Sequence, residues 1–197
     1  MNIQHELDQS ISPFRLLDHP FYRAWECGEL PIEKLSRYAE EYGAFIQNMP
    51  LGWETLNDAE TALEEEEHSQ LWQSFAQGLG TQIKPAQIPE TQALIALAKE
   101  LFAVPASALG ALYAFESQQP ETASTKLKGL LEFYQLPQSV EPYFEEHSRN
   151  HHESEKILNA LEALDASEQR RAVSACKQMS KALWDALSGI HNSPALN

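Results

Sequence analysis

The chain has 197 residues, of which 43% are hydrophobic and 22% charged, enough to bury one substantial core. Its 29 acidic residues against 14 Lys and Arg give a formal net charge of -15, which repels phosphate backbones and anionic lipid head groups. Nucleic acid and membranes are therefore poor partners. The first ten residues, MNIQHELDQS, lack the basic and apolar segments of a signal peptide. We expect a single cytoplasmic domain over residues 1–197, with a homodimer left open.

Apolar residues recur at helical spacing through almost the whole chain, whereas no segment shows the strict alternation of apolar and polar residues that is typical of a β-strand. The class expected is therefore all-α, a bundle of seven or eight helices. We expect helices at 31–49, ending at Pro50, and at about 58–78, 90–103, 105–117, 121–134, 137–164 and 168–190. Gly78 and Gly80 are suited to ending the second of these, and residues 81–89 form a linker.

The two cysteines, Cys27 and Cys176, are far apart in sequence and form no CxxC pair. Each lies on an apolar helical pattern. In a reducing compartment this predicts two buried free thiols rather than a disulfide.

His68 lies on or beside the apolar stripe of the 58–78 helix, three residues before Leu71 and seven before Phe75. Glu64 and Glu65 stand one turn earlier, so either carboxylate is placed to contact the imidazole. The plainest interpretation is a core histidine hydrogen-bonded by a neighbouring carboxylate. The run EEEE at 64–67 is otherwise typical of a solvated face.

Two further helices also place ionisable groups among core residues. Glu116 falls four residues after Leu112 and three after Tyr113, and a buried carboxylate needs a partner such as Lys, Arg or a metal ion. On the 137–164 helix, His147 and His151 form an i, i+4 pair that is suited to one metal ion.

These polar groups come from three different helices, which is how helical bundles assemble metal sites. Nitrogen and carboxylate donors without thiolate favour iron or manganese, and an iron with open positions can activate dioxygen. Zinc stays open.

A family resemblance is carried by four phrases in order: HPFYRAWECGELPIEKLSRYAEEY, EEHSQLWQSFAQGLG, ALGALYAFESQQPETASTKLKGLLEFY and YFEEHSRNHHESE. They resemble the superfamily of TenA, pyrroloquinoline-quinone synthase and the Chlamydia death-domain-associating protein, most closely the last branch, over about residues 19–158. The resemblance implies a haem-oxygenase-like bundle.

Members of that branch resemble non-haem iron oxidases with a Glu seven residues before a His, a Glu in an ALGALYA(Y/F)E phrase, and a later HxxxDxxH. By this resemblance His68, Glu116 and His147 would be metal ligands. The other three ligand positions hold Thr61, His151 and Ser154. A standard two-metal centre is therefore not expected. The remaining donors, with His151 and with Glu64 in place of the missing carboxylate, would hold one ion or none.

Some members of the branch resemble para-aminobenzoate synthases that consume their own tyrosine, with a lysine as nitrogen source. The positions that match, all with the family's residue type, are Tyr22, Tyr38, Lys126 and Tyr143. The alternative is that the tyrosines are core residues and that Lys126 is solvated.

Three functions follow from these observations. The first is a non-haem iron oxidase or oxygenase with an incomplete ligand set, acting on a small molecule in para-aminobenzoate or cofactor biosynthesis. The second is a metal-free enzyme that resembles TenA or quinone synthase. The third is a non-catalytic protein that has lost the metal site and binds a small aromatic ligand or a partner chain.

Overall fold

The computed structural model describes residues 2–194. In that range the chain forms helices joined by loops, with no β-strand. The elements are α1 (Ile3–Ile11), η1 (Ser12–Phe14), η2 (Leu16–Asp18), α2 (Pro20–Glu26), α3 (Ile32–Ile46), α4 (Met49–Thr55), α5 (Ala59–Gly78), α6 (Pro89–Phe102), α7 (Pro105–Glu116), α8 (Gln119–Phe133), η3 (Gln138–Val140), α9 (Pro142–His147), α10 (His152–Glu162) and α11 (Ala166–Asn192), where η marks a 3-10 helix. The predicted all-α class is confirmed.

Capping side chains and glycines set several helix ends. Asp58 accepts a hydrogen bond from the backbone N–H of Thr61 at the start of α5, and Gly80, with φ of 74°, turns the chain after its end. Asp165 and Glu168 form a reciprocal capping box at the start of α11. The glycine stop predicted after residue 78 is confirmed.

Two of the expected helices are each interrupted. Pro50 does not end the first one: α3 already ends at Ile46, and Pro50 lies in the first turn of α4, where its missing N–H costs nothing. The expected 137–164 helix is divided into η3, α9 and α10, and residues 148–151 leave the helix. Because of these breaks, and because α1 and α2 were not predicted, the described residues form more helices than the seven or eight that we expected.

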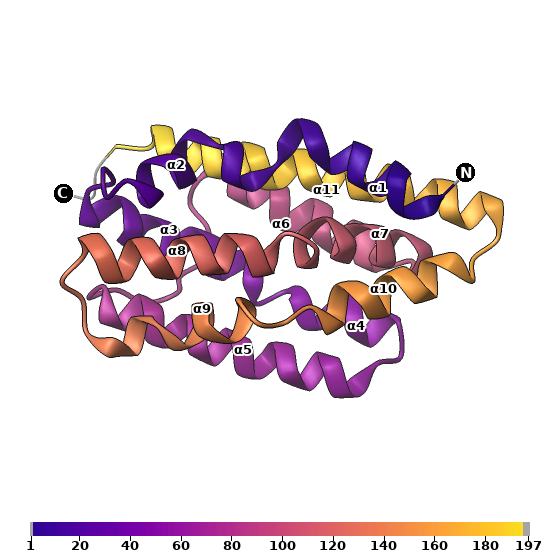
Figure 1. Cartoon of the computed structure of the whole chain (residues 1–197). Coiled ribbons are helices and arrows are strands. Elements are labelled where there is room, and N and C mark those ends of the chain that lie inside the picture. Colours follow the sequence, from indigo (N-terminus) through magenta and orange to yellow (C-terminus); the bar gives the residue numbers. More distant parts are fainter. Residues whose placement is uncertain (1, 195–197) are drawn as a thin grey trace.

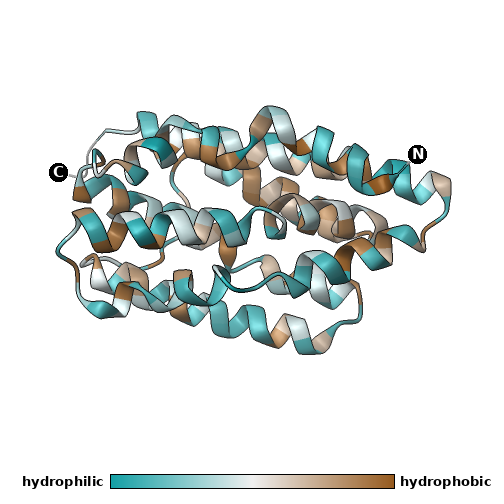
Figure 2. Cartoon of the chain, viewed as in Figure 1, coloured by the Kyte–Doolittle hydropathy of each residue, from teal (hydrophilic) through white to brown (hydrophobic). Residues whose placement is uncertain are grey.

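Helix α7 lies at the centre of the bundle, and every residue from Ala106 to Glu116 is buried. Figure 2 shows this helix mostly in brown, the hydrophobic end of the scale. Helix α11 packs closely along it at Gly110, where an added Cβ would lie 1.9 Å from the carbonyl oxygen of Ala172. Only glycine allows this approach.

Helix α7 contacts six other helices, which are α1, α4, α6, α8, α10 and α11. In the view of Figure 1, α1 and α11 run side by side along the top and α5 runs along the bottom. Helix α9 contacts both α5 and α8, and α10 contacts α7. Helices from three separate parts of the sequence, namely α5, α7 and the pair α9 and α10, can therefore contribute to one interior region.

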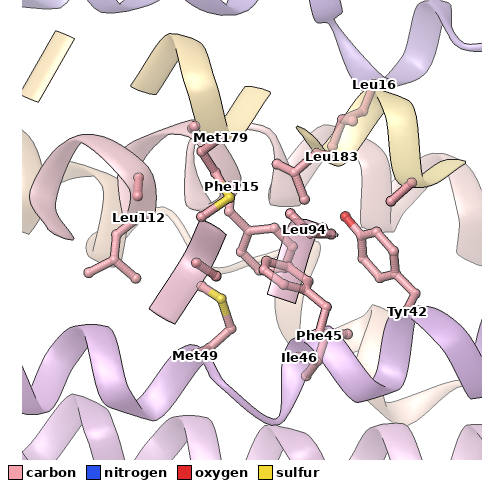
Figure 3. Close-up of a cluster of buried hydrophobic side chains, with 14 of the residues drawn as sticks. Leu16, Tyr42, Phe45, Ile46, Met49, Leu94, Leu112, Phe115, Met179 and Leu183 are labelled. Atoms are coloured by element: carbon pink, nitrogen blue, oxygen red, sulfur yellow. The ribbon is translucent and has the colours of Figure 1, made fainter. Parts of the chain in front are cut away.

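Part of the hydrophobic core lies where α3 and α4 meet α7 and α11 (Figure 3). Residues from α3 and α4 face Leu112 and Phe115 of α7 and Met179 and Leu183 of α11. All are almost fully buried; those of α3 and α4 are Tyr42, Phe45, Ile46 and Met49.

The cysteine prediction is half right. Cys176 is buried, but Cys27 is exposed, because it directly follows the last residue of α2, where Gly28 turns the chain with φ of 69°. Both thiols are free, as predicted.

Among residues 2–194, no helix combines the length and the apolar character needed to cross a membrane.

Candidate metal centre and the adjoining tyrosine–lysine cluster

Five buried ionisable side chains from four helices form what we call the acid–histidine cluster. Helix α5 provides Glu65 and His68, and the last residues of α7 and α9 provide Glu116 and His147. Glu153 comes from the first turn of α10. The exposed fraction is 8% for His68 and 3% or less for the other four. Ionisable side chains are seldom buried to this extent without a partner.

The donor atoms of Glu65, His68 and Glu153 all lie within 4.8 Å of one another. His68 Nδ1 is 3.6 Å from Glu65 Oε1, too far for a hydrogen bond. The rings of His68 and His147 are 4.4 Å apart between centroids. Glu65, His68 and Glu153 therefore lie close together without hydrogen-bonding one another, and the His147 ring adjoins His68.

Unpaired atoms in the cluster give the clearest indication of a missing partner. Glu65 Oε1, His68 Nδ1, Glu153 Oε1 and both carboxylate oxygens of Glu116 are buried without a hydrogen-bond partner. Each such atom costs roughly 1–3 kcal/mol, and more if the group is charged. A divalent cation among these atoms would satisfy several of them together, so the donor set fits a metal ion.

His147 is oriented as a metal-binding imidazole usually is. Its Nδ1–H donates a 2.8 Å hydrogen bond to the carbonyl oxygen of Tyr143, which leaves Nε2 with a free lone pair. Burial, aided by His68, lowers the pKa of His147 to about 3, so the ring is neutral at physiological pH. A neutral imidazole held in one tautomer is the form that binds metal.

Burial raises the pKa of Glu65 and of Glu116, and neighbouring negative charges add to both shifts. Burial raises the pKa of Glu116 well above its ordinary value, and the charges of Glu153 and Glu65 add to the shift. Burial lowers the pKa of His68, but Glu65 and Glu153 outweigh this and the net shift is upward. Without a cation the cluster retains protons, and a bound cation would displace them.

Three of the predicted ligands lie near one another in the interior, and their role as metal ligands stays a prediction. The rings of His68 and His147 adjoin, and Glu116 is close enough to Glu65 and Glu153 for their charges to raise its pKa. The expected continuous helix after His147 is wrong, however, and His151 is an exposed residue preceding α10. Ser154 is half-buried and donates to the carbonyl oxygen of His151. Glu64 keeps 43% of its side chain exposed, and its donor atom groups with those of His152 and Glu153 rather than with those of Glu65 and His68.

Glu65 and Glu153 were therefore not among the ligands predicted from the sequence. A signal for Glu65 existed, since it stands three residues before His68 and shares its helix face. No comparable signal existed for Glu153, because the apolar spacing continues unchanged across the break at residues 148–151. This break turns Glu153, and not His151 or Ser154, toward the interior.

Thr61, at the position where the resemblance led us to expect a carboxylate, has a structural contact instead. It is 1% exposed, and its hydroxyl accepts a 2.7 Å hydrogen bond from Lys156 of α10. Lys156 also pairs with Asp58, 2.5 Å away. This position thus links α5 to α10.

A second buried group, the tyrosine–lysine cluster, consists of Tyr22, Tyr38 and Lys126 from α2, α3 and α8. The two tyrosine hydroxyl oxygens are 2.7 Å apart, and Lys126 Nζ donates to the Tyr38 hydroxyl at 3.2 Å. The same Nζ lies 4.6 Å from the centre of the Tyr22 ring. Lys126 is 3% exposed, so the alternative of a solvated lysine is wrong.

Burial lowers the pKa of Lys126 from 10.5 to about 7. A sizeable fraction of the amine is thus neutral at physiological pH and carries a free lone pair.

Tyr143 lies between the two clusters. Its ring stacks on His147, with centroids 4.0 Å apart and an interplanar angle of 24°. Phe144, the next residue, lies 5.6 Å from Lys126 Nζ on the side of the tyrosine–lysine cluster. One short helix, α9, therefore contacts both groups.

The chain is thus a helical bundle that buries a carboxylate–histidine cluster from four helices, an arrangement typical of helical metal proteins. The chain matches the family model of iron-containing redox enzymes over residues 39–185, and it belongs to that family. The 4-aminobenzoate synthase of Nitrosomonas europaea is 30% identical, over 98% of this chain and 93% of that protein. The 4-aminobenzoate synthase of Chlamydia muridarum is 28% identical, over 96% and 90%.

Solved structures share the fold. A TenA homologue from Pseudomonas syringae matches with a TM-score of 0.79 at 14% identity, over 97% of this chain and 93% of that one. A domain with a haem-oxygenase-like fold from Shewanella denitrificans matches with a TM-score of 0.76 at 18% identity, over 95% and 90%. The haem-oxygenase-like fold implied by the sequence is confirmed.

Proposed function

We propose that this chain is a non-haem iron oxidase that makes 4-aminobenzoate, with iron held by the acid–histidine cluster and the tyrosine–lysine cluster as the reacting group. The observation that carries the proposal is the position of α9, whose Tyr143 stacks on His147 while Phe144 faces Lys126. The metal donors and the reactive amine thus adjoin one short element.

The acid–histidine cluster suits iron better than the alternatives. Its donors are three carboxylates and two imidazoles with no thiolate, a set typical of iron or manganese. A bound iron would supply the activation of dioxygen. His151, predicted as a ligand, is replaced in this proposal by Glu65 and Glu153.

The chain's own residues would provide the ring and the nitrogen of the product. Tyr22 carries a buried aromatic ring, and the partly neutral Lys126 amine lies beside it. The Tyr38 hydroxyl contacts both the Tyr22 hydroxyl and Lys126 Nζ, so it holds the pair in place. Burial of all three excludes water from the reacting groups.

Two relatives named 4-aminobenzoate synthase support this choice of product, since they align over nearly the full chain. The proposal further includes a cytoplasmic location, which we expected because the first ten residues do not resemble a signal peptide.

The test is to load the metal-free protein with Fe²⁺ anaerobically, add a reductant and dioxygen, and measure 4-aminobenzoate by mass spectrometry. Protein carrying ¹⁵N-lysine should yield ¹⁵N-labelled product. The intact mass of the chain should fall for two reasons: Tyr22 would lose its ring and Cβ when the Cα–Cβ bond breaks and Cβ is oxidised to the carboxylate by dioxygen, and Lys126 would lose its ε-nitrogen, which replaces the hydroxyl oxygen on the ring. Tyr22→Phe and Lys126→Met should abolish the product. Tyr134→Phe is the matched control, because its hydroxyl contacts only the Leu30 carbonyl, outside both clusters.

Iron-loaded protein that yields no product would contradict the proposal. Binding of an aromatic ligand without turnover, seen as a raised melting temperature, would then favour the non-catalytic alternative.

A further inference from the structure

A hollow of about 580 Å³ opens at the surface beside the acid–histidine cluster. It lies between α5 and the chain from the end of α9 to the start of α10. Three carboxylates, those of Glu64, Glu67 and Glu146, line it together with the imidazole of His152. His68 also lines this hollow, which therefore connects the solvent with a buried donor.

A second set of potential ligands lies at this hollow. The donor atoms of Glu64, His152 and Glu153 are all within 4.8 Å of one another. His152 Nε2 is 3.8 Å from Glu64 Oε2, and these two side chains are 63% and 43% exposed. The three groups thus combine two solvent-facing donors with one interior donor.

Glu153 distinguishes this set from an ordinary group of surface acids. It is 3% exposed and its Oε1 has no hydrogen-bond partner, yet it belongs to both ligand sets. Burial of a carboxylate between two sets of donors is costly unless a cation lies near it. With two oxygens, one carboxylate can contact a cation on either side.

We propose that Glu64, His152 and Glu153 form an outer binding site for a divalent transition-metal ion, on the path by which the ion reaches the acid–histidine cluster. The donor chemistry, one imidazole and two carboxylates, suits Fe²⁺, Mn²⁺ or Co²⁺ rather than Mg²⁺ or Ca²⁺, which prefer oxygen ligands alone. A hollow lined by carboxylates raises the local cation concentration and the rate of entry. The role in loading, but not the outer site itself, rests on the buried site proposed above.

The test uses Co²⁺ as the probe, because its visible absorption reports the ligands around it. Metal-free full-length protein is titrated with Co²⁺ by calorimetry, and the rate of uptake is followed by stopped-flow absorption. The variant Glu64→Gln with His152→Ala removes two outer donors and leaves all five residues of the acid–histidine cluster. Glu66→Gln is the matched control, since Glu66 is an exposed residue of α5 that does not line the hollow.

We expect two binding events of different affinity in the wild type and in the Glu66→Gln control. The double variant should keep only the tighter event and should fill it at least about tenfold more slowly. Circular dichroism of each variant is the check that the fold is retained.

The other outcomes are distinguishable. A single event that persists unchanged in the double variant would overturn the outer site while leaving the buried site intact. A single event that disappears in the double variant would support the outer site and contradict the buried one, and with it the role in loading. Two events that the double variant leaves unchanged would overturn the assignment of these residues.

Discussion

The ring of Tyr143 stacks on the ring of His147 at 4.0 Å, and the carbonyl oxygen of Tyr143 accepts the His147 Nδ1–H at 2.8 Å. One residue thus fixes both the tilt and the tautomer of the imidazole. This arrangement presents His147 Nε2 as a donor before any metal binds, which reduces the cost of ordering the site.

Replacing Glu116 by Gln should weaken metal binding and flatten the pH dependence of stability. The raised pKa of Glu116 means that the folded, metal-free chain keeps a proton which the unfolded chain loses above its ordinary pKa of 4.5. The free energy of unfolding therefore falls as pH rises above that value, and Glu116→Gln removes this part of the fall.

The measurements are the affinity for Fe²⁺ or Co²⁺, which should drop at least about tenfold, and urea unfolding of the metal-free protein from acid to neutral pH. Glu132→Gln, at an exposed position of α8, should match the wild type in both. Unchanged affinity in Glu116→Gln would remove Glu116 from the ligand set.

Lys126→Met should raise the free energy of unfolding relative to the wild type at low pH. The gain should become smaller as the pH rises. Because burial lowers the pKa from 10.5 to about 7, the folded state releases its proton at lower pH than the unfolded state does. Below about 7 the full cost of burying the ammonium is present, and it declines as pH rises toward 10.5.

Urea unfolding of wild type and Lys126→Met at about pH 6 and about pH 9 measures this difference. Lys128→Met, at an exposed position of the same helix, is the control. An equal difference at both pH values would show that the amine does not titrate in this range.

Removing the amine of Lys156 should loosen the attachment of α10 to α5. Lys156→Ala deletes the hydrogen bond to Thr61 and the ion pair with Asp58, and because the lysine is 46% exposed the loss should be only about 1 kcal/mol. Hydrogen exchange should increase mainly at the start of α10. Lys177→Ala, at an exposed position of α11, should change neither quantity; equal exchange in both variants would refute the link.

Gly110→Ala should be strongly destabilising. The added methyl would lie 1.9 Å from the Ala172 carbonyl oxygen, so α7 and α11 must separate, at a cost of about 3 kcal/mol or more. Ser174→Ala, an exposed change on α11, should leave the melting temperature nearly unchanged. A melting temperature equal to that of the wild type would show that the two helices are not held at this distance.

The sequence sufficed for the helical class because amphipathic spacing recurs along the chain, and helical spacing placed His68 and Glu116 on buried faces. It could not predict the break at residues 148–151. That break contains no proline or glycine, and the three-and-four spacing of Phe144, His147 and His151 runs into it.

The consequence for the site is specific. A continuous helix would present His151 and Ser154 to the interior, whereas the break presents Glu153. Likewise, Glu64 and Glu65 both stand one turn before His68, and which of them faces the interior depends on how α5 is rotated against its neighbours α3, α4 and α9. The ligand set therefore emerges only from tertiary structure.

The most direct test of the central claim is anomalous scattering at the iron edge from crystals of the Fe²⁺-loaded, oxygen-free protein. We predict a peak among the side chains of Glu65, His68, Glu116, His147 and Glu153. Iron-loaded crystals with no peak there would contradict the account.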